Sequence, residues 1–367
     1  MKIPFISFDY QNKIKAKILE SIEKVIDSKN YVLGSNLSEF EKKYSEINKI
    51  KYSVGVGSGL DALSICLKAL NIGNGDEVIV ASNAYIACWL SISNVNAKIV
   101  PVEPDIQTFN IDPNKIENNI SNRTKAIMPV HLFGQCCEMD KIMHIAKKYN
   151  LFVVEDNAQA HLAKFKSQYS GTFGEINATS FYPTKNLGAF GEAGCITTNE
   201  KGLKDFVLAY RNYGSRVKYI NEIVGTNSRL DEIQASILNV KLDYIREWNK
   251  QRKNIAGKYD QFLSNIDSIV IPKRKKNFDH VYHLYVIRTE KRNELKKYLN
   301  LNGIGTSIHY PKPPHLQKAY SNLNYKIGDF PIAEKLSKTS LSLPIFPGMT
   351  DLQIEQISKL IIKFFKN

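Results

Sequence analysis

The sequence has no long apolar run, and this absence argues against a membrane-spanning helix, which needs about 20 consecutive apolar residues. The first residues, Met1 to Phe5, also lack the apolar core of a secretion signal. We therefore expect a cytoplasmic protein that has no contact with a membrane.

Cysteine is also scarce. The five cysteines are Cys66, Cys88, Cys136, Cys137 and Cys195. Their number is odd and no Cys-X-X-Cys spacing occurs, which argues against a disulfide framework or a metal site. We expect buried free thiols and no bound metal.

Acidic residues are too few to balance the basic ones, so the net charge is +14. Such a charge attracts nucleic acids or phosphorylated ligands. The lysines are scattered, however, and the densest cluster, residues 273–276, also fits a solvated loop. A compositional bias of the source genome would explain the charge equally. We expect no nucleic-acid partner, and keep a basic, non-catalytic regulatory protein as a remote alternative.

The chain has 367 residues, more than one hydrophobic core usually serves. We expect a large domain at 1–244 and a small one at 245–367. Short apolar segments alternate with helical patterns, which predicts an α/β fold with a mostly parallel sheet covered on both faces. The expected strands of the large domain are 52–56, 78–80, 99–102, 126–130, 151–155, 177–182 and 194–198.

Other elements follow from apolar periodicity. A single helical pattern over 228–264 is expected to link the two domains, and the tail is expected to be α+β. The remaining expected helices are 11–27, 36–47, 60–71, 83–95, 113–120, 138–149, 200–212, 291–301 and 350–366, and the expected strands of the tail are 281–288 and 305–309.

Four residues follow predicted strands, namely Gly57, Tyr85, His131 and Asp156. Ligands on parallel sheets bind beyond the carboxyl ends of the strands. We therefore expect these positions to lie around one site.

Asp156 ends a strongly apolar run, where a carboxylate is costly unless it is paired or hydrogen-bonded. Lys185 follows 29 positions later (185 − 156). An acid that pairs with a pyridine N–H and a lysine that forms a Schiff base suit pyridoxal phosphate. A structural ion pair or a helix cap also explains Asp156. Gln159 or His161 is expected at the ring hydroxyl, and His161 is a candidate for orienting Asp156.

The turn Gly57-Ser58-Gly59 opens a helix, whose free N–H groups suit a phosphate. An ordinary strand–helix turn is equally compatible, and the motif is not a P-loop. Tyr85 is placed to stack on a cofactor ring. Ser180 is a candidate phosphate donor and Tyr182 a candidate substrate contact.

Longer motifs extend over most of the chain. They are Gly-Ser-Gly-Leu-Asp-Ala-Leu (57–63), Gly-Asp-Glu-Val-Ile-Val (75–80), Pro-Val-His-Leu-Phe-Gly-Gln (129–135), Val-Val-Glu-Asp-Asn-Ala-Gln-Ala-His (153–161), Ser-Phe-Tyr-Pro-Thr-Lys-Asn-Leu-Gly (180–188), Asn-Ser-Arg-Leu-Asp-Glu-Ile-Gln-Ala (227–235) and Ile-His-Tyr-Pro (308–311). With them the chain resembles the sugar aminotransferases of the DegT/DnrJ/EryC1/StrS family. The resemblance implies the aspartate-aminotransferase fold (pyridoxal-phosphate fold type I).

The resemblance also implies roles for individual residues. Lys185 would hold the cofactor aldehyde and Asp156 the pyridine nitrogen. Gln159 would meet the ring hydroxyl and Tyr85 would stack on the ring. The implied phosphate ligands are Ser58, Gly59, Leu60 and Ser180, with Asn227 contributed by the neighbouring subunit of a homodimer with shared active sites.

Three positions depart from the family pattern. Leu60 stands where threonine is common, so a hydroxyl contact is missing. Asn157 and Leu162 replace smaller residues and are expected to crowd the pocket slightly.

Within the family, the segments 83–89 and 212–219 resemble 3-aminotransferases that act on dTDP-3-keto-6-deoxyhexoses. This implies glutamate as amino donor and a 3-amino-3,6-dideoxy product in the galactose or glucose configuration, for lipopolysaccharide or S-layer glycans. A 4-aminotransferase on a 4-keto sugar is the main alternative. Candidate substrate contacts are Tyr182, Arg216, Lys218, Tyr219, Arg229, His309 and Tyr310, although Arg229 would equally pair with Asp231 or cap the following helix.

Overall fold

The computed structural model describes residues 2–274 and 277–366. The helices are α1 (Lys15–Ser28), α2 (Ser35–Asn48), α3 (Gly59–Ala69), α4 (Ile86–Asn94), α5 (Met139–Tyr149), α6 (Lys201–Tyr210), α7 (Glu232–Leu242), α8 (Ile245–Leu263), α9 (Arg292–Leu301), α10 (Pro331–Thr339) and α11 (Asp351–Lys366). Within these ranges, none of the helices is both long and apolar enough to span a bilayer.

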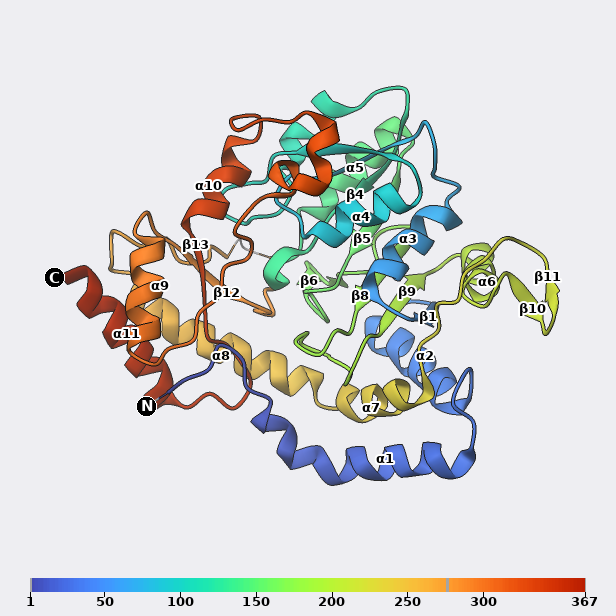
Figure 1. Cartoon of the computed structure of the whole chain (residues 1–367), viewed down its shortest axis with the longest axis horizontal. Helices are drawn as coiled ribbons and strands as arrows, with labels where there is room; N and C mark the ends of the chain where they lie inside the picture. Colours follow the sequence, from blue (N-terminus) through green and yellow to red (C-terminus); the bar gives the residue numbers. More distant parts are fainter. Residues whose placement is uncertain (1, 275–276, 367) are drawn as a thin grey trace.

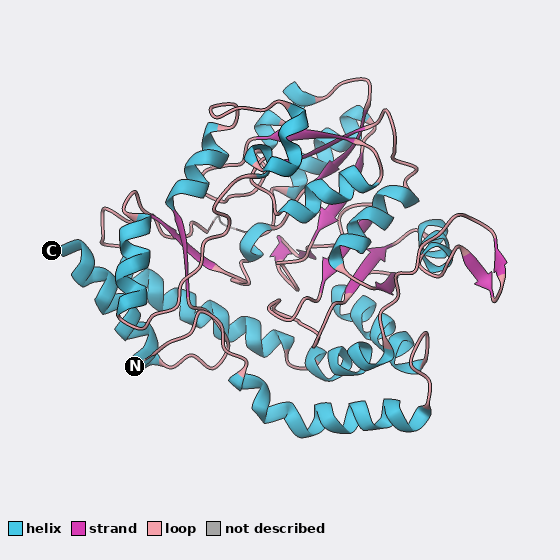
Figure 2. Ribbon diagram, in the orientation of Figure 1, coloured by secondary structure: helices cyan, strands magenta, loops and turns pink. Residues whose placement is uncertain are grey.

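A sheet lies at the centre of the molecule, with its strands shown in magenta in Figure 2. It has seven strands in the order β1-β9-β8-β5-β4-β2-β3. Strand β9 runs antiparallel to both of its neighbours, and the other pairs are parallel. This confirms the predicted mostly parallel α/β sheet. The strands are β1 (Tyr52–Val56), β2 (Glu77–Ala81), β3 (Lys98–Val102), β4 (Thr124–Met128), β5 (Phe152–Asp156), β8 (Ile176–Ser180) and β9 (Gly194–Thr198).

Both faces of the sheet are buried, as the apolar strands predict. Successive side chains of a strand point to opposite faces. In β9, Cys195 packs into a core cluster with residues of α2 and α7, whereas Ile196 packs into the large cluster with α3, α4 and α5. All five cysteines are buried, as expected.

A second core lies at the carboxyl-terminal end, where α9 and α11 flank β12 (Tyr285–Arg288) and β13 (Ser340–Leu343) (Figure 1). Ile3 from the start of the chain is buried in this core and hydrogen-bonds the backbone of Gly303 and Gly305 at 2.9 and 2.8 Å. The tail thus has the expected α+β character, and the domain boundary at 244/245 stays a prediction.

Two helix predictions were wrong. Residues 113–120 form two short 3₁₀ turns, because the Asp112 side chain accepts from Asn114 N and the following N–H groups bond three residues back. The pattern over 228–264 begins only at residue 232 and breaks at Tyr244, whose backbone leaves ideal helical geometry (φ −104°) while its ring stacks on Trp248.

The predicted strands of the tail were also partly wrong. Strand β12 begins at Tyr285, because Val281 and Leu284 donate instead to the loop carbonyls of Gly134 and Phe133. Residues 305–309 form no strand, since Gly305 bonds Ile3 and Ser307 bridges Ser342 in β13, on two different segments. Helix α10 and strand β13 were not predicted from the sequence.

Candidate active site

Asp156 and Lys185 lie on neighbouring segments at the carboxyl-terminal edge of the sheet. Asp156 is the last residue of β5 and pairs in register with Ala178 of β8. Lys185 is partly buried in the loop that follows β8. Burial lowers the pKa of Lys185, and the nearby Asp156 carboxylate opposes this shift. A lysine with a lowered pKa holds more neutral amine, the form that attacks an aldehyde.

The Asp156 carboxylate is 6% exposed and has two donors on the described chain. Cys88 Sγ lies 3.0 Å from Oδ2, and the Ala158 N–H donates to Oδ1 at 2.9 Å. A thiol is a weak donor, so a protonated pyridine nitrogen would be a stronger partner for this buried charge. Cys88 was predicted only as a buried free thiol, although its position three residues after Tyr85 places it near the expected site.

The predicted phosphate turn and Ser180 meet at the start of α3. Ser58 caps the helix, because its Oγ accepts from Asp61 N at 3.1 Å. The N–H groups of Gly59 and Leu60 belong to the first turn, where a helix has no internal acceptor. A Cβ on Gly59 would lie 2.5 Å from Ser180 Cβ. The site therefore offers backbone donors, a helix start and a serine at one point, which suits a phosphate.

The close approach at Gly59 makes a prediction. Gly59→Ala should destabilise the fold by about 1–3 kcal/mol through overpacking against Ser180 and should weaken cofactor binding. Gly202→Ala in α6 is the matched control, because no atom lies within 4 Å of its added methyl group. Urea unfolding and cofactor titration measure the two effects. If both variants had the same free energy of unfolding and the same cofactor affinity, the prediction would be wrong.

Residues of the tail reach the same site. Gln159 Nε2 donates to the Tyr310 hydroxyl at 3.1 Å, while its Oε1 accepts from Phe133 N at 2.6 Å. The Tyr310 ring lies 5.1 Å from the ring of Tyr85, which is 46% exposed. His309 interacts electrostatically with Lys185. The structure thus brings Tyr85, Gln159, His309 and Tyr310 together, as the sequence predicts, and Gln159 keeps a second N–H for a ring hydroxyl.

His161 makes no hydrogen bond to Asp156 in the described chain, and its contact with a ring hydroxyl stays a prediction. Its Nε2 lies 3.0 Å from the Ser180 carbonyl, which only accepts, so Nε2 carries the proton. Its Nδ1 is buried without a hydrogen-bond partner in the described chain. Burial and then Lys185 lower the pKa of His161 to about 3. His161 therefore braces the end of β8 as a neutral side chain instead of orienting Asp156.

Buried neutral histidines predict acid sensitivity. Burial also lowers the pKa of His280 to about 3, and in the unfolded chain both His161 and His280 titrate near 6.5. The unfolded state binds more protons below pH 6.5, so stability falls as the pH decreases from 6.5 toward 3. We expect a loss of roughly 2 kcal/mol per histidine between pH 7 and 5.

Urea unfolding at the two pH values checks this loss. His280→Gln should remove about half of the pH dependence that the two histidines cause. An unfolding free energy that stays constant over this range would contradict the prediction.

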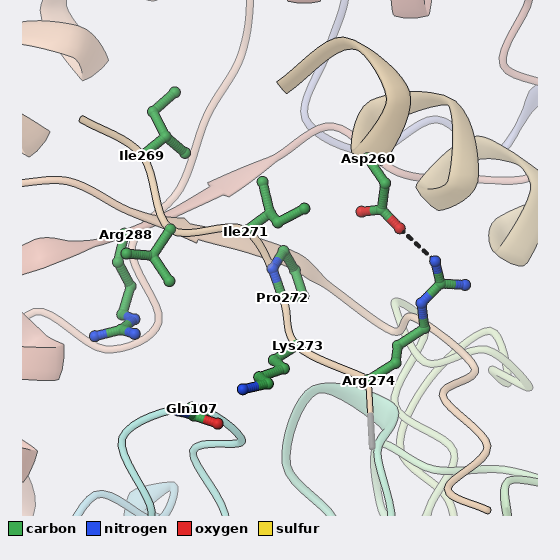
Figure 3. Close-up of a pocket in the computed structure, with 9 residues that line it drawn as sticks. Gln107, Asp260, Ile269, Ile271, Pro272, Lys273, Arg274 and Arg288 are labelled. Atoms are coloured by element: carbon green, nitrogen blue, oxygen red, sulfur yellow. Dashed lines mark hydrogen bonds and ion pairs between the residues drawn. The ribbon is translucent and has the colours of Figure 1, made fainter. Parts of the chain in front are cut away.

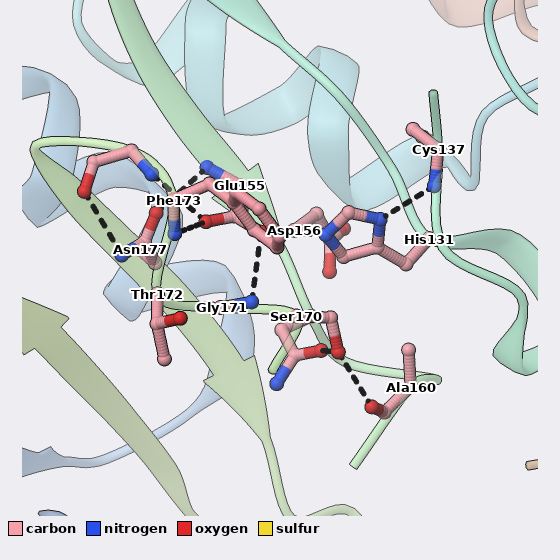
Figure 4. Close-up of polar contacts among 12 residues, drawn as sticks. His131, Cys137, Glu155, Asp156, Ala160, Ser170, Gly171, Thr172, Phe173 and Asn177 are labelled. Carbon is pink, nitrogen blue, oxygen red and sulfur yellow. Dashed lines mark hydrogen bonds and ion pairs between the residues drawn. The ribbon is translucent and has the colours of Figure 1, made fainter. Parts of the chain in front are cut away.

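His131 follows β4 and contacts Glu155 near the end of β5 (Figure 4). Its Nε2 lies 2.7 Å from Glu155 Oε2, and its Nδ1 accepts from Cys137 N at 3.1 Å. Glu155 is fully buried and also accepts three backbone N–H groups at 2.5 to 2.9 Å, from Gly171, Phe173 and Gly174. Strand alternation explains why Glu155 points away from the site that its neighbour Asp156 faces.

Three candidate substrate residues do not join the site within one chain. Arg216, Lys218 and Tyr219 lie on the hairpin of β10 (Ser215–Val217) and β11 (Ile220–Asn221), which lies beyond α6 at one end of the molecule (Figure 1). Arg216 pairs with Glu222 at 3.5 Å, and Tyr219 is 86% exposed.

Two further candidates lie next to this hairpin. Asn227 is exposed and forms a β-bridge with Asn212. Arg229 donates to Asn212 Oδ1 at 2.9 Å and lies over the Tyr213 ring. It therefore contacts neighbours other than Asp231, the partner considered from the sequence.

The two bulky departures from the family pattern are used in packing. Asn157 Oδ1 accepts from Ser170 Oγ at 2.6 Å. Leu162 is buried in the cluster that contains Phe181. These contacts direct both side chains into the interior, away from the crowding that we expected.

A groove of about 580 Å³ lies elsewhere and has a basic lining, including Lys273, Arg274 and Arg288 (Figure 3). None of the predicted site residues lines it. Arg274 is paired with Asp260 at 2.7 Å, so part of its charge is compensated. Lys275 and Lys276, the other members of the predicted basic cluster, lie outside the described residues.

The residues present fit pyridoxal phosphate: a helix start beside Ser180 for the phosphate, a buried carboxylate with a weak donor for the ring nitrogen, and a lysine with a lowered pKa. Sheet and site together define an aminotransferase of the aspartate-aminotransferase fold. The chain belongs to the DegT/DnrJ/EryC1/StrS aminotransferase family, whose model matches residues 12–361. The predicted family and fold class are confirmed.

Known proteins similar to the chain cover it almost completely. The dTDP-3-amino-3,6-dideoxy-alpha-D-galactopyranose transaminase of Aneurinibacillus thermoaerophilus is 46% identical over 99% of both chains. The crystal structure of S. venezuelae DesV in complex with a ketimine intermediate has a TM-score of 0.98 at 40% identity, with 100% and 99% coverage. That of ntda from Bacillus subtilis with bound cofactor pmp has a TM-score of 0.93 at 31% identity, with 100% and 86% coverage.

Proposed function

We propose that the chain is a pyridoxal-phosphate-dependent aminotransferase that moves an amino group from glutamate to C3 of a dTDP-3-keto-6-deoxyhexose. The product would be a dTDP-3-amino-3,6-dideoxyhexose in the galactose or glucose configuration. The observation that carries the proposal is the Lys185–Asp156 pair at adjacent strand ends of this family's fold. The similarity to the galactopyranose transaminase supports the sugar and the C3 position.

When bound, the cofactor supplies an electron sink that acidifies the carbon next to the amine. Asp156 would hold the positive charge on the ring nitrogen. Lys185 Nζ takes the proton from Cα of glutamate, for which its lowered pKa provides the neutral amine. Tyr85 would stack on the ring, and the start of α3 would hold the phosphate. His309, which interacts electrostatically with Lys185, and Tyr310, which hydrogen-bonds Gln159, would contact the hexose together with Tyr182.

The cations for the nucleotide diphosphate are proposed to come from the partner subunit of a homodimer. Arg216 and Lys218 project on a hairpin that carries exposed apolar residues, with Val217 and Ile220 each 58% exposed. An apolar groove between α1 and the loop after Lys185 includes Phe190 and Leu19. Such exposed apolar surface marks protein interfaces. Asn227 and Arg229 lie on the segment that follows the hairpin.

The substrate proposal is tested with purified protein, pyridoxal phosphate and glutamate. A dTDP-3-keto-6-deoxyhexose and a dTDP-4-keto-6-deoxyhexose are supplied separately, and the products are assigned by mass spectrometry and NMR. Amination at C3 is expected. Amination of the 4-keto sugar alone would replace the proposal with its alternative, and no amination of either would overturn both.

The shared site is tested by mixing two variants, Lys185→Ala and the double variant Arg216→Ala/Lys218→Ala. Each should be inactive alone. If the sites are shared between subunits, exchanged dimers should recover part of the activity, because one site per dimer is intact. Light scattering gives the mass of the unchanged protein in solution. If that protein were a monomer and fully active, the shared-site proposal would be wrong.

We place the reaction in the cytoplasm and the product in lipopolysaccharide or S-layer glycans. The five free, buried thiols suit a reducing compartment. The nucleotide-linked amino sugar named for the similar transaminase supports a role in deoxysugar synthesis.

A further inference from the structure

A buried lysine lies behind the loop that carries Lys185. Lys241 on α7 is 1% exposed, and lysine is almost never fully buried unless it is paired. Its Nζ donates to the Gly188 carbonyl at 2.6 Å and lies 4.0 Å from the centre of the Phe190 ring. No carboxylate forms an ion pair with it in the described part of the chain, and burial lowers its pKa to about 7.

The loop that Lys241 contacts is closed at its base. Ala189 N donates to the Phe181 carbonyl at 2.8 Å, and Lys185 N donates to the Tyr182 carbonyl at 2.8 Å. The two arms are so close that a Cβ on Gly188 would lie 2.4 Å from the Pro183 carbonyl oxygen. A shift of the Gly188 carbonyl is therefore passed on to Lys185 through only two intervening residues.

A second side chain of α7 holds the same loop. Gln234 Oε1 accepts from Phe190 N at 2.8 Å. Gln234 and Lys241 are seven residues apart (241 − 234), about two helical turns, so they lie on the same face of α7. The loop is thus fastened to one rigid helix by an acceptor and a donor.

We propose that Lys241 is a positioning residue, whose hydrogen bond to Gly188 and contact with Phe190 hold the Lys185 loop in the geometry that directs Lys185 toward Asp156. This rests on the proposed role of Lys185 in transamination. Burying an ammonium group costs desolvation free energy. The Gly188 carbonyl and the Phe190 ring offset part of this penalty only while the loop keeps this conformation.

The test compares Lys241→Met, which keeps the length but removes the donor, with Lys241→Arg, which keeps a donor, and with Lys338→Met in α10 as the control. Hydrogen–deuterium exchange of the cofactor-free protein measures how often the backbone amides of the loop lose their hydrogen bonds. We expect the amides of Lys185 and Ala189 to exchange about tenfold faster in Lys241→Met only. With cofactor, kcat should fall between about tenfold and a hundredfold with little change in KM, and Lys241→Arg should recover part of the loss.

Two outcomes would overturn the proposal. One is loop exchange and kcat equal to those of the unchanged protein, and the other is faster exchange throughout the chain, which would make Lys241 a general core residue. Gln234→Ala serves if Lys241→Met does not fold, and should loosen the same amides. If the unchanged protein shows no transamination but the loop amides of Lys241→Met still exchange faster, the proposed function fails. The anchoring of the loop by Lys241 then stands.

Discussion

Replacing Lys185 with alanine is expected to lower kcat by roughly 10⁴-fold, because one side chain supplies both the covalent link to the cofactor and the base for the Cα proton. The visible absorbance of the covalently bound cofactor should disappear, and dialysis should remove the cofactor. Steady-state kinetics and a spectrum before and after dialysis measure the two effects.

Lys185→Arg separates chemistry from charge. Arginine keeps a positive charge at the site but stays protonated, so it can neither form the link nor accept a proton. It should be as inactive as alanine. Lys359→Ala, on the exposed face of α11, should match the unchanged protein. An arginine variant with substantial activity would reduce Lys185 to a structural cation.

Asp156→Asn is expected to have the second largest effect, with kcat lower by about 10²–10³-fold, in the range found when one preorganised electrostatic group is removed. The amide is close in size to the carboxylate but has no charge for the ring nitrogen. The cofactor should remain covalently bound, because Lys185 and the start of α3 are unchanged. Kinetics and the absorbance spectrum distinguish this from Lys185→Ala.

Asp351→Asn provides the matched control, since Asp351 is a highly exposed carboxylate of α11. It should have normal kcat. If Asp156→Asn kept normal kcat, the assignment of the ring-nitrogen partner would be wrong. If it instead lost the cofactor altogether, Asp156 would be needed for binding more than for chemistry.

The parallel part of the sheet was predictable because buried strands are short and apolar, and because their carboxyl ends collect the ligand-binding residues. Asp156 and Gly59 stood out for the same reason. Strand β13 has only four residues (Ser-Leu-Ser-Leu), so its polar–apolar alternation is a weak signal in the sequence. That strand forms through its pairing with β12, which is a long-range contact.

The remaining parts of the site depend on contacts that no local pattern encodes. Cys88 on α4 contacts Asp156 although 68 positions separate the two residues, and the sequence shows only an apolar helix around Cys88. Lys241 resembles the solvated lysines of any helix, and its burial follows from how α7 packs against the loop after Lys185. The hairpin around Lys218 was predicted to bind substrate. Within one chain it lies beyond α6, away from the other site residues.

The start of the chain has an unusual relation to the site. Ile3 is buried beside Gly305, and the ring of Phe5 stacks on His309 with 5.7 Å between the centres. Chain termini usually tolerate insertion, because few contacts hold them. Here the residues before α1 support the wall behind the proposed hexose site. The aromatic side chain at position 5 therefore helps to set the position of His309.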